Sequence, residues 1–286
     1  MGLSRSEEAL ERELAHYDEH HRYWLDFLEY DATPLRRWLI NKVLLTWDRQ
    51  FALLDPALIK DKVVLEAACG HPRVLYYLKS LGAKEAIGVD LSPRFVNRGL
   101  ACRRTYVYDR QLDCRPEKIQ LRFGDINGPV AADLKPDVIA CFQSLHHLDL
   151  PRFAQTCGRL LRAGGHVIIS DPVGDHPLRR LGDIVGRAYG LLSPDEASLA
   201  PAKVLGCFAA EGFAPILCRS MNPLAEIYFH LTGMLASFSR RLSFWARLPL
   251  AWWRPIENFL ERTVIRRWPR LGWRFFLVLE KKADDN

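Results

Sequence analysis

The sequence contains no uninterrupted apolar run of about 18 residues, the length that a membrane-spanning helix needs. Residues 1–8 also lack the apolar segment of a secretory signal. Hydrophobic residues make up 49% of the 286 positions and charged residues 26%, which is typical of a globular chain that can bury a core. These features predict a cytoplasmic protein without a spanning helix.

Signatures of disulfides and structural zinc are missing as well. The seven cysteines form an odd number, and no two of them have the Cys-x-x-Cys spacing. Several lie inside apolar runs, where free thiols are typically buried. We therefore expect a reducing compartment, no disulfide framework and no bound metal.

Lysine is missing from the stretch between Arg219 and Arg274, although the net charge is +6. This stretch is rich in arginine and tryptophan and holds only three acids, Glu226, Glu257 and Glu261. The last third of the chain therefore differs in composition from the first two thirds and calls for a separate interpretation.

Short apolar runs rich in valine and isoleucine begin near residue 61 and alternate with helical stretches. This alternation predicts an α/β fold in which helices cover both faces of a mostly parallel sheet. We expect a Rossmann-like, seven-stranded sheet with an N-terminal helical cap and a helical insertion before the last strand. The predicted strands are 63–65, 86–89, 119–123, 137–142, 166–170, 215–218 and 274–280.

Three regions follow from this pattern. Residues 1–58 are expected to form the helical cap. Residues 59–218 and 271–282 would form the sheet domain, and residues 219–270 a basic, tryptophan-rich helical insertion.

Polar residues stand where the apolar runs stop, and ligands of such sheets bind beyond the carboxyl ends of the strands. The first run ends at Glu66 and turns through Gly70 into a helix, which exposes backbone N–H groups to an anion. Asp90, which ends the second run, is suitably placed to accept both hydroxyls of a ribose. The loop lacks the Gly-x-Gly-x-x-Gly pattern of a pyrophosphate site, and its carboxylate would repel pyrophosphate but could face an ammonium group. The combination indicates a nucleoside joined to an amino acid.

Five motifs, in order, resemble those of the class I S-adenosylmethionine-dependent methyltransferases, in particular the branch acting on quinones and natural products. They are Val64-Leu65-Glu66-Ala67-Ala68-Cys69-Gly70, Gly88-Val89-Asp90-Leu91-Ser92, Phe123-Gly124-Asp125-Ile126, Phe142-Gln143-Ser144-Leu145-His146-His147-Leu148 and Leu160-Leu161-Arg162-Ala163-Gly164-Gly165. The resemblance covers about residues 60–215 and the final strand.

The resemblance implies S-adenosylmethionine as cofactor and S-adenosylhomocysteine as its product. The residues it assigns to the cofactor are Glu66, Ala67 and Gly70 at the methionine part, Asp90 at the ribose, Leu91, Asp125 and Ile126 at the adenine, and Gln143 near the sulfonium. Tyr17, in the predicted cap, is a further candidate for contacting the cofactor carboxylate.

Two positions of the first motif depart from the family pattern. Ala68 and Pro72 stand where the family usually has glycine. Alanine adds a methyl group where backbone and ligand come close, and proline removes a donor. A member of the fold that binds the cofactor without catalysis therefore stays open as an alternative.

His146 and His147 follow the fourth predicted strand, at the mouth of the site. Methyl transfer from a sulfonium needs a base only when the acceptor must lose a proton, and histidine suits that role near neutral pH. Either histidine could instead have a packing role.

Members that methylate nucleobase amines carry an Asn/Asp-Pro-Pro-aromatic run here, whereas this chain has Gln143-Ser144-Leu145-His146. A small, apolar or lipid-like acceptor is therefore favoured over nucleic acid, with RNA methylation as an alternative.

Arginine and aromatic residues are interspersed along residues 224–270. Such a stretch suits a peripheral membrane contact, a lid over an apolar substrate, a homodimer surface or a helical subdomain with its own core. Binding of nucleic acid through this stretch is the least favoured of these uses.

Overall fold

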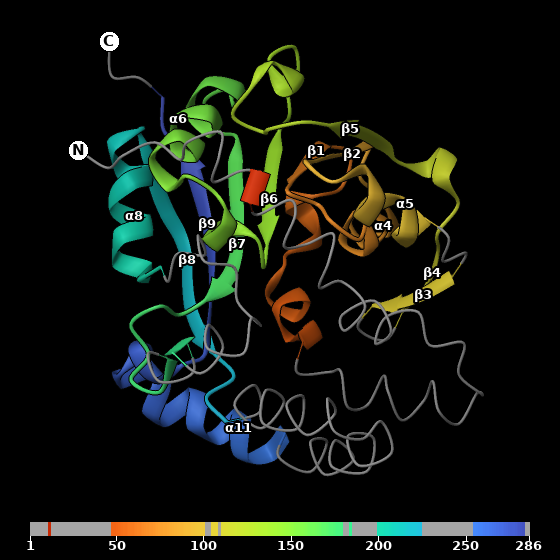
Figure 1. Cartoon of the computed structure of the whole chain (residues 1–286). Coiled ribbons are helices and arrows are strands. Elements are labelled where there is room, and N and C mark those ends of the chain that lie inside the picture. The colour runs from red at the N-terminus through yellow and green to blue at the C-terminus, as the bar shows by residue number, and fades with distance from the viewer. Residues whose placement is uncertain are drawn as a thin grey trace.

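The computed structural model describes residues 11–12, 47–100, 104–107, 110–179, 183–184, 199–224 and 254–283 (Figure 1). Most of the predicted N-terminal cap, including Tyr17, and most of the predicted insertion lie outside these residues. The sheet domain is almost completely described.

A seven-stranded sheet forms the centre of the molecule, in the order β5-β2-β1-β6-β7-β9-β8. The first five strands in this order run parallel, while β9 is antiparallel to both β7 and β8. The predicted Rossmann-like, mostly parallel sheet is therefore confirmed. The strands are β1 Val63–Ala67, β2 Glu85–Asp90, β5 Gln120–Phe123, β6 Val138–Phe142, β7 His166–Pro172, β8 Phe213–Met221 and β9 Arg274–Lys281.

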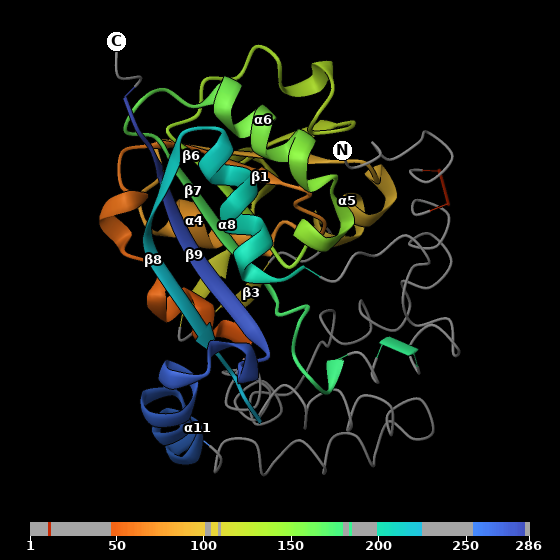
Figure 2. The same ribbon diagram turned by 90° about the vertical axis from the view of Figure 1, so that its left-hand side faces the viewer.

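Helices cover both faces of this sheet because its central strands are apolar on both sides. On one face α6 (Leu150–Leu160) and α8 (Pro201–Ala210) contribute Phe153 and Phe208 to a core that includes Leu65 and Ile139. On the other face α4 (Arg73–Ser80) and the segment before β1 pack on alternate strand residues such as Val64. Figure 2 shows α6 and α8 on the same side of β8 and β9. The alternation fixes which residue at each strand end faces which helical layer.

Proline, aspartate and glycine mark many helix boundaries. Asp149, for example, caps α6 by accepting a hydrogen bond from the N–H of Arg152 over 3.3 Å, with Pro151 in the first turn. The α-helices are α4 Arg73–Ser80, α5 Pro93–Leu100, α6 Leu150–Leu160, α8 Pro201–Ala210 and α11 Arg254–Leu260. Shorter 3-10 helices span Trp47–Leu53, Pro56–Leu58, Pro116–Lys118, Pro129–Ala131, Leu145–His147 and Pro269–Leu271, and a π-helical segment spans Glu261–Ile265.

Two features differ from the sequence-based expectation. Strand β8 continues to Met221 because it pairs with β9 along its length, so the predicted boundary at residue 218 falls inside a strand. A short antiparallel pair of strands, β3 Arg104–Val107 and β4 Arg110–Asp113, lies between α5 and β5 and was not predicted. The three-region division is otherwise still a prediction.

Among the described residues, no helix is long and apolar enough to cross a membrane. The same residues contain no group of three or more histidine, cysteine, aspartate or glutamate side chains that could hold a metal ion.

Candidate active site at the carboxyl ends of β1, β2, β5, β6 and β7

A tight turn joins β1 to α4 and is held against the end of β2. The N–H of Cys69 donates to the carbonyl oxygen of Val89 over 3.1 Å. Ala68 has a φ of 50° and Gly70 a φ of 45°, so two residues of this turn adopt the left-handed conformation. Ala68 carries a Cβ in that conformation and is therefore strained.

The carboxylate of Asp90 organises this turn. Its Oδ2 accepts a hydrogen bond from the N–H of Gly70 over 2.7 Å, and its Oδ1 accepts one from Ser92 over 2.8 Å. Burial raises the pKa of Asp90, while these N–H donors act in the opposite direction. Each oxygen of a carboxylate has a second lone pair, so Asp90 can hold the turn and still accept ligand hydroxyls.

Glu66 is a buried carboxylate at the end of β1, with 2% of its surface exposed. Burial, and secondarily the nearby Asp90, raise its pKa well above the ordinary value. Its Oε2 is buried and has no hydrogen-bond partner among the described residues. An unsatisfied buried acceptor is costly, so this atom suits a cationic donor such as the ammonium group of an amino acid.

His71 follows Gly70 and is a candidate site residue that the sequence analysis did not identify. Both of its ring nitrogens are buried and have no hydrogen-bond partner within the described part of the chain. Burial, and secondarily the charge of Arg73, lower its pKa to about 4. The imidazole is therefore neutral at physiological pH, and it can offer one donor and one acceptor to a ligand.

The β2 strand approaches the turn closely because Gly88 has no side chain. A Cβ on Gly88 would lie 2.6 Å from Cδ1 of Leu75 and 2.7 Å from Sγ of Cys69. A larger residue would push the turn away from Asp90, so this glycine keeps the turn and the end of β2 together.

Past β5, the Asp125 side chain accepts a hydrogen bond from the N–H of Asn127 over 2.9 Å. Leu91, predicted to pack on adenine, is 37% exposed at the end of β2. Ile126, by contrast, is only 3% exposed and belongs to the sheet core. Asp125 and Leu91 are therefore the more accessible of the residues predicted at the adenine.

The turn after β6 approaches the end of β1. Gln143 has a φ of 58°, and its N–H donates to the carbonyl oxygen of Ser170 over 2.7 Å. The Ser144 hydroxyl lies within hydrogen-bonding distance of the carbonyl oxygen of Ala67, at 3.4 Å. The Ala67 side chain is fully buried in the core, so only its backbone is suitably placed for a role at the site.

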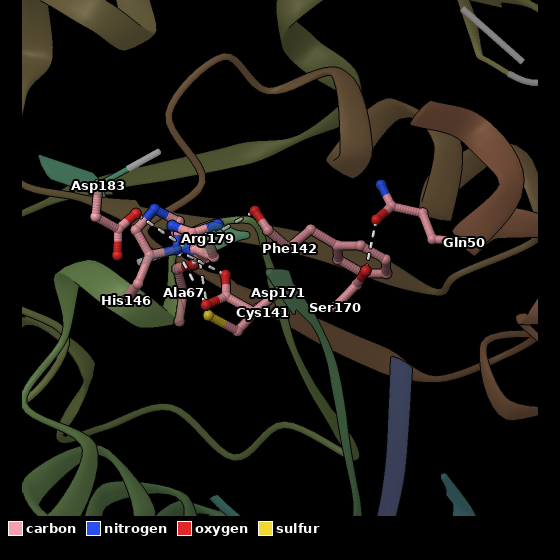
Figure 3. Close-up of polar contacts among 10 residues, drawn as sticks. Gln50, Ala67, Cys141, Phe142, His146, Ser170, Asp171, Arg179 and Asp183 are labelled. Atoms are coloured by element: carbon pink, nitrogen blue, oxygen red, sulfur yellow. Dashed lines mark hydrogen bonds and ion pairs between the residues drawn. The ribbon is translucent and has the colours of Figure 1, made fainter. Parts of the chain in front are cut away.

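The His146 imidazole lies against the buried carboxylate of Asp171 next to this turn, as Figure 3 shows. Nδ1 of His146 lies 2.9 Å and 3.0 Å from the two carboxylate oxygens of Asp171, which is fully buried at the end of β7. The His147 ring lies with its centroid 3.9 Å from that of His146. A carboxylate on Nδ1 favours the tautomer that carries its proton there and leaves Nε2 as the basic atom.

A second ion pair lies in the segment after β7. Nε of the buried Arg179 is 3.3 Å from Oδ1 of Asp183 (Figure 3). This pair adds a buried cation to the chain that follows Asp171.

The structure thus gathers Glu66, Gly70, Asp90, Gln143 and His146 at one edge of the sheet. Asp171 and His71 were missed by sequence analysis. Asp171 is a polar residue at the carboxyl end of an apolar run, as Asp90 is. Because this signal identified Asp90, the sequence alone could have identified Asp171 as well. His71 gave no comparable signal, because burial of both its nitrogens is visible only in the structure.

Comparison with known proteins places this site in context. A family profile described as a methyltransferase domain matches residues 37–198. A curated relative, the tRNA U34 carboxymethyltransferase of Cellvibrio japonicus, is 34% identical over 74 residues. That match covers 26% of this chain and only 20% of the relative, so the chain spans about a fifth of the length of that protein.

Solved structures share the fold at low sequence identity. An S-adenosylmethionine-dependent methyltransferase from Mesorhizobium loti has a TM-score of 0.51 and 15% identity, covering 83% of this chain and 98% of its own. Magnesium protoporphyrin IX methyltransferase from Synechocystis, solved with bound S-adenosylhomocysteine, has a TM-score of 0.56 and 11% identity, covering 96% and 100%.

Proposed function

The chain belongs to the methyltransferase domain family, and from this premise we propose that it methylates a small, apolar acceptor that loses a proton in the reaction. S-adenosylmethionine as the methyl donor agrees with this family and with the fold that the chain shares with S-adenosylmethionine-dependent methyltransferases. The cofactor, the acceptor and the role of each site residue are the parts that we propose.

The residues around the β1 turn fit the cofactor. The orphaned Oε2 of Glu66 suits the ammonium group of its methionine part, and Asp90 suits the ribose hydroxyls. Leu91 and Asp125 would lie along the adenine, and Gln143 beside the sulfonium. The cofactor supplies a methyl carbon that is already activated, so the protein mainly has to align the acceptor and exclude water.

The His146–Asp171 pair carries the proposal about the acceptor. Asp171 holds Nδ1 of His146, so Nε2 can accept the proton of an acceptor hydroxyl or another acidic group. The acceptor loses this proton as its own lone pair attacks the methyl carbon. The cofactor would leave as the neutral sulfide S-adenosylhomocysteine, and the proton would stay on the imidazole. An acceptor that is already a strong nucleophile would not need this pair.

Apolar small molecules are favoured over nucleobase amines because the turn after β6 reads Gln143-Ser144-Leu145-His146. The second candidate is an RNA acceptor, which the short match to the tRNA U34 carboxymethyltransferase favours.

One labelling experiment separates these candidates. The full chain is incubated with methyl-tritiated S-adenosylmethionine and either total lipid-soluble extract or bulk tRNA. We expect label to enter the organic phase and to require His146. Label in acid-precipitable RNA instead would overturn the small-molecule proposal. A buffer incubation without acceptor is the control.

A further inference from the structure

A basic, apolar surface lies on the outer side of the segment that runs from α11 to Leu271. It is formed by the exposed apolar side chains Ile256, Phe259 and Trp268 together with the exposed guanidinium groups Arg262, Arg266, Arg267 and Arg270. We call this set the outer α11 face.

The two acids of this segment point away from the outer α11 face. Oε1 of Glu257 accepts a hydrogen bond from the N–H of Leu224 over 3.0 Å, and Oε1 of Glu261 accepts one from Asn222 over 3.1 Å. Glu257 and Ile265 are each 3% exposed, and with Glu261 they follow each other at four-residue spacing on the inner side. Residues 254–273 contain no other acid, so the outer side carries positive charge only.

Arginine and tryptophan occur here in a combination suited to an interface between water and hydrocarbon. The guanidinium carbon of Arg267 lies 5.6 Å from the centroid of the Trp268 ring. Phe259 is 64% exposed, which is unusual for so large an apolar side chain. Aromatic rings favour the headgroup level of a bilayer, and arginines bind anionic headgroups while their apolar stems stay at the surface.

The outer α11 face lies near the edge of the sheet where the parallel strands have their carboxyl ends. This segment leads into β9, whose first residue Arg274 pairs with Pro172 of β7 and with Met221 of β8. Asp171 pairs in the same register with Phe275. Both views show α11 beyond the end of β8 and the start of β9 (Figures 1 and 2).

We propose that the outer α11 face docks on an anionic lipid surface. Charge complementarity favours anionic headgroups, and exposed Ile256 and Phe259 gain by entering the acyl boundary. A second copy of the chain is disfavoured because the same face on both partners would bring arginines against arginines, with no carboxylates to pair with them. The phosphates of a nucleic acid would pair with the arginines, but a nucleic acid offers little apolar surface against which Ile256 could be buried. Docking would bring the carboxyl ends of the strands close to molecules dissolved in the bilayer.

Vesicle flotation of the full chain tests this proposal. The vesicles are neutral phosphatidylcholine, or phosphatidylcholine with about one quarter phosphatidylserine. We expect binding to the anionic vesicles at least roughly tenfold stronger than to the neutral ones, and weaker binding at high salt. Equal binding to both, or no binding to either, overturns the proposal.

Variants locate the surface. Arg266→Glu with Arg267→Glu reverses two charges and is expected to reduce anionic binding at least about tenfold. Phe259→Ser removes the apolar contact and is expected to reduce it about threefold or more. Arg152→Glu with Arg159→Glu, at exposed positions of α6, makes the same change in net charge and should bind like the parent protein.

Two results contradict the proposal in different ways. Equal loss in the α6 control would mean that net charge alone acts. If Phe259→Ser binds normally and single-stranded RNA displaces the vesicles, the face binds nucleic acid instead. Far-ultraviolet circular dichroism and cofactor affinity, measured for every variant, separate loss of docking from loss of folding or of the proposed activity.

Discussion

Oδ2 of Asp90 accepts a hydrogen bond from the N–H of Gly70 over 2.7 Å, across 20 residues of sequence. The acid that we assign to the ribose therefore also holds the turn that we assign to the methionine part. Because one carboxylate serves both elements, substitution at this position should affect ligand binding and the turn together.

Asp90→Ala is therefore expected to weaken S-adenosylmethionine binding by at least about tenfold, since charge-assisted hydrogen bonds are lost on both sides of the carboxylate. Titration calorimetry measures this. Asp133→Ala, which removes an exposed carboxylate paired with Arg122, is the control and should bind normally. Unchanged affinity in Asp90→Ala would remove Asp90 from the site.

Ala68 provides a test of backbone strain. Its φ of 50° is unfavourable for any residue with a Cβ, so Ala68→Gly should raise the free energy of unfolding by about 1 kcal/mol in urea denaturation. Ala67→Gly, at the neighbouring buried strand position, should instead lower it by a similar amount. A loss of stability in both variants would show that the turn is not strained.

Much of this architecture could be predicted from local sequence. The apolar runs at Val64, Val89 and Ile139 are bounded by polar or glycine residues, so the sequence predicted both the strands and the edge of the sheet where the candidate site lies. The signal is strong because central strands are buried on both faces and read as continuous apolar runs.

The remainder depends on tertiary contacts. The β3–β4 hairpin was missed because Arg104-Thr105-Tyr106-Val107 lacks a long apolar run. The role of Asp171 follows from where β6 and β7 place their ends, and that of His71 from burial of its ring. The inward turn of Glu257 and Glu261 likewise depends on the end of β8, which no periodicity in the segment itself identifies.

His71 should make stability depend on pH. Its pKa is about 4 in the folded chain and near 6.5 when unfolded, so the unfolded state binds more protons between these values. The stabilising contribution of the neutral ring is therefore complete above pH 6.5 and is lost as pH falls toward 4, by up to about 3 kcal/mol.

Urea denaturation at pH 7 and pH 4.5 measures this difference. His71→Gln removes the titrating group and should lose less stability than the parent protein over that interval. His166→Gln, at a half-buried position on β7, is the control and should behave like the parent. Equal acid sensitivity of His71→Gln and the parent would contradict the prediction.

Glu66 should couple cofactor binding to proton release. Burial raises its pKa, so the free protein keeps a proton on this carboxyl group at a higher pH than an exposed glutamate would. An ammonium group beside the orphaned Oε2 favours the ionised form, and binding should therefore expel a proton. Calorimetry over a range of pH, in buffers of different ionisation enthalpy, measures the number of protons released on binding. Glu66→Gln should bind more weakly and release none; equal release in both proteins would place the proton elsewhere.

The His146–Asp171 pair predicts coupled effects on catalysis. His146→Gln removes the proposed base and should lower kcat about 100-fold or more with the best acceptor from the labelling assay, with loss of the acidic limb of the pH–rate profile. Asp171→Asn leaves the base in place but no longer fixes its tautomer, so kcat should fall by a comparable factor at little change in KM. Because both act on one proton transfer, the double variant should be about as slow as either single one.

Additive losses would mean that the two residues act separately, and unchanged kcat in His146→Gln would mean that the acceptor is deprotonated without help from the protein. Cofactor affinity and thermal unfolding, measured on each variant, distinguish a lost base from a disrupted core, since Asp171 is fully buried.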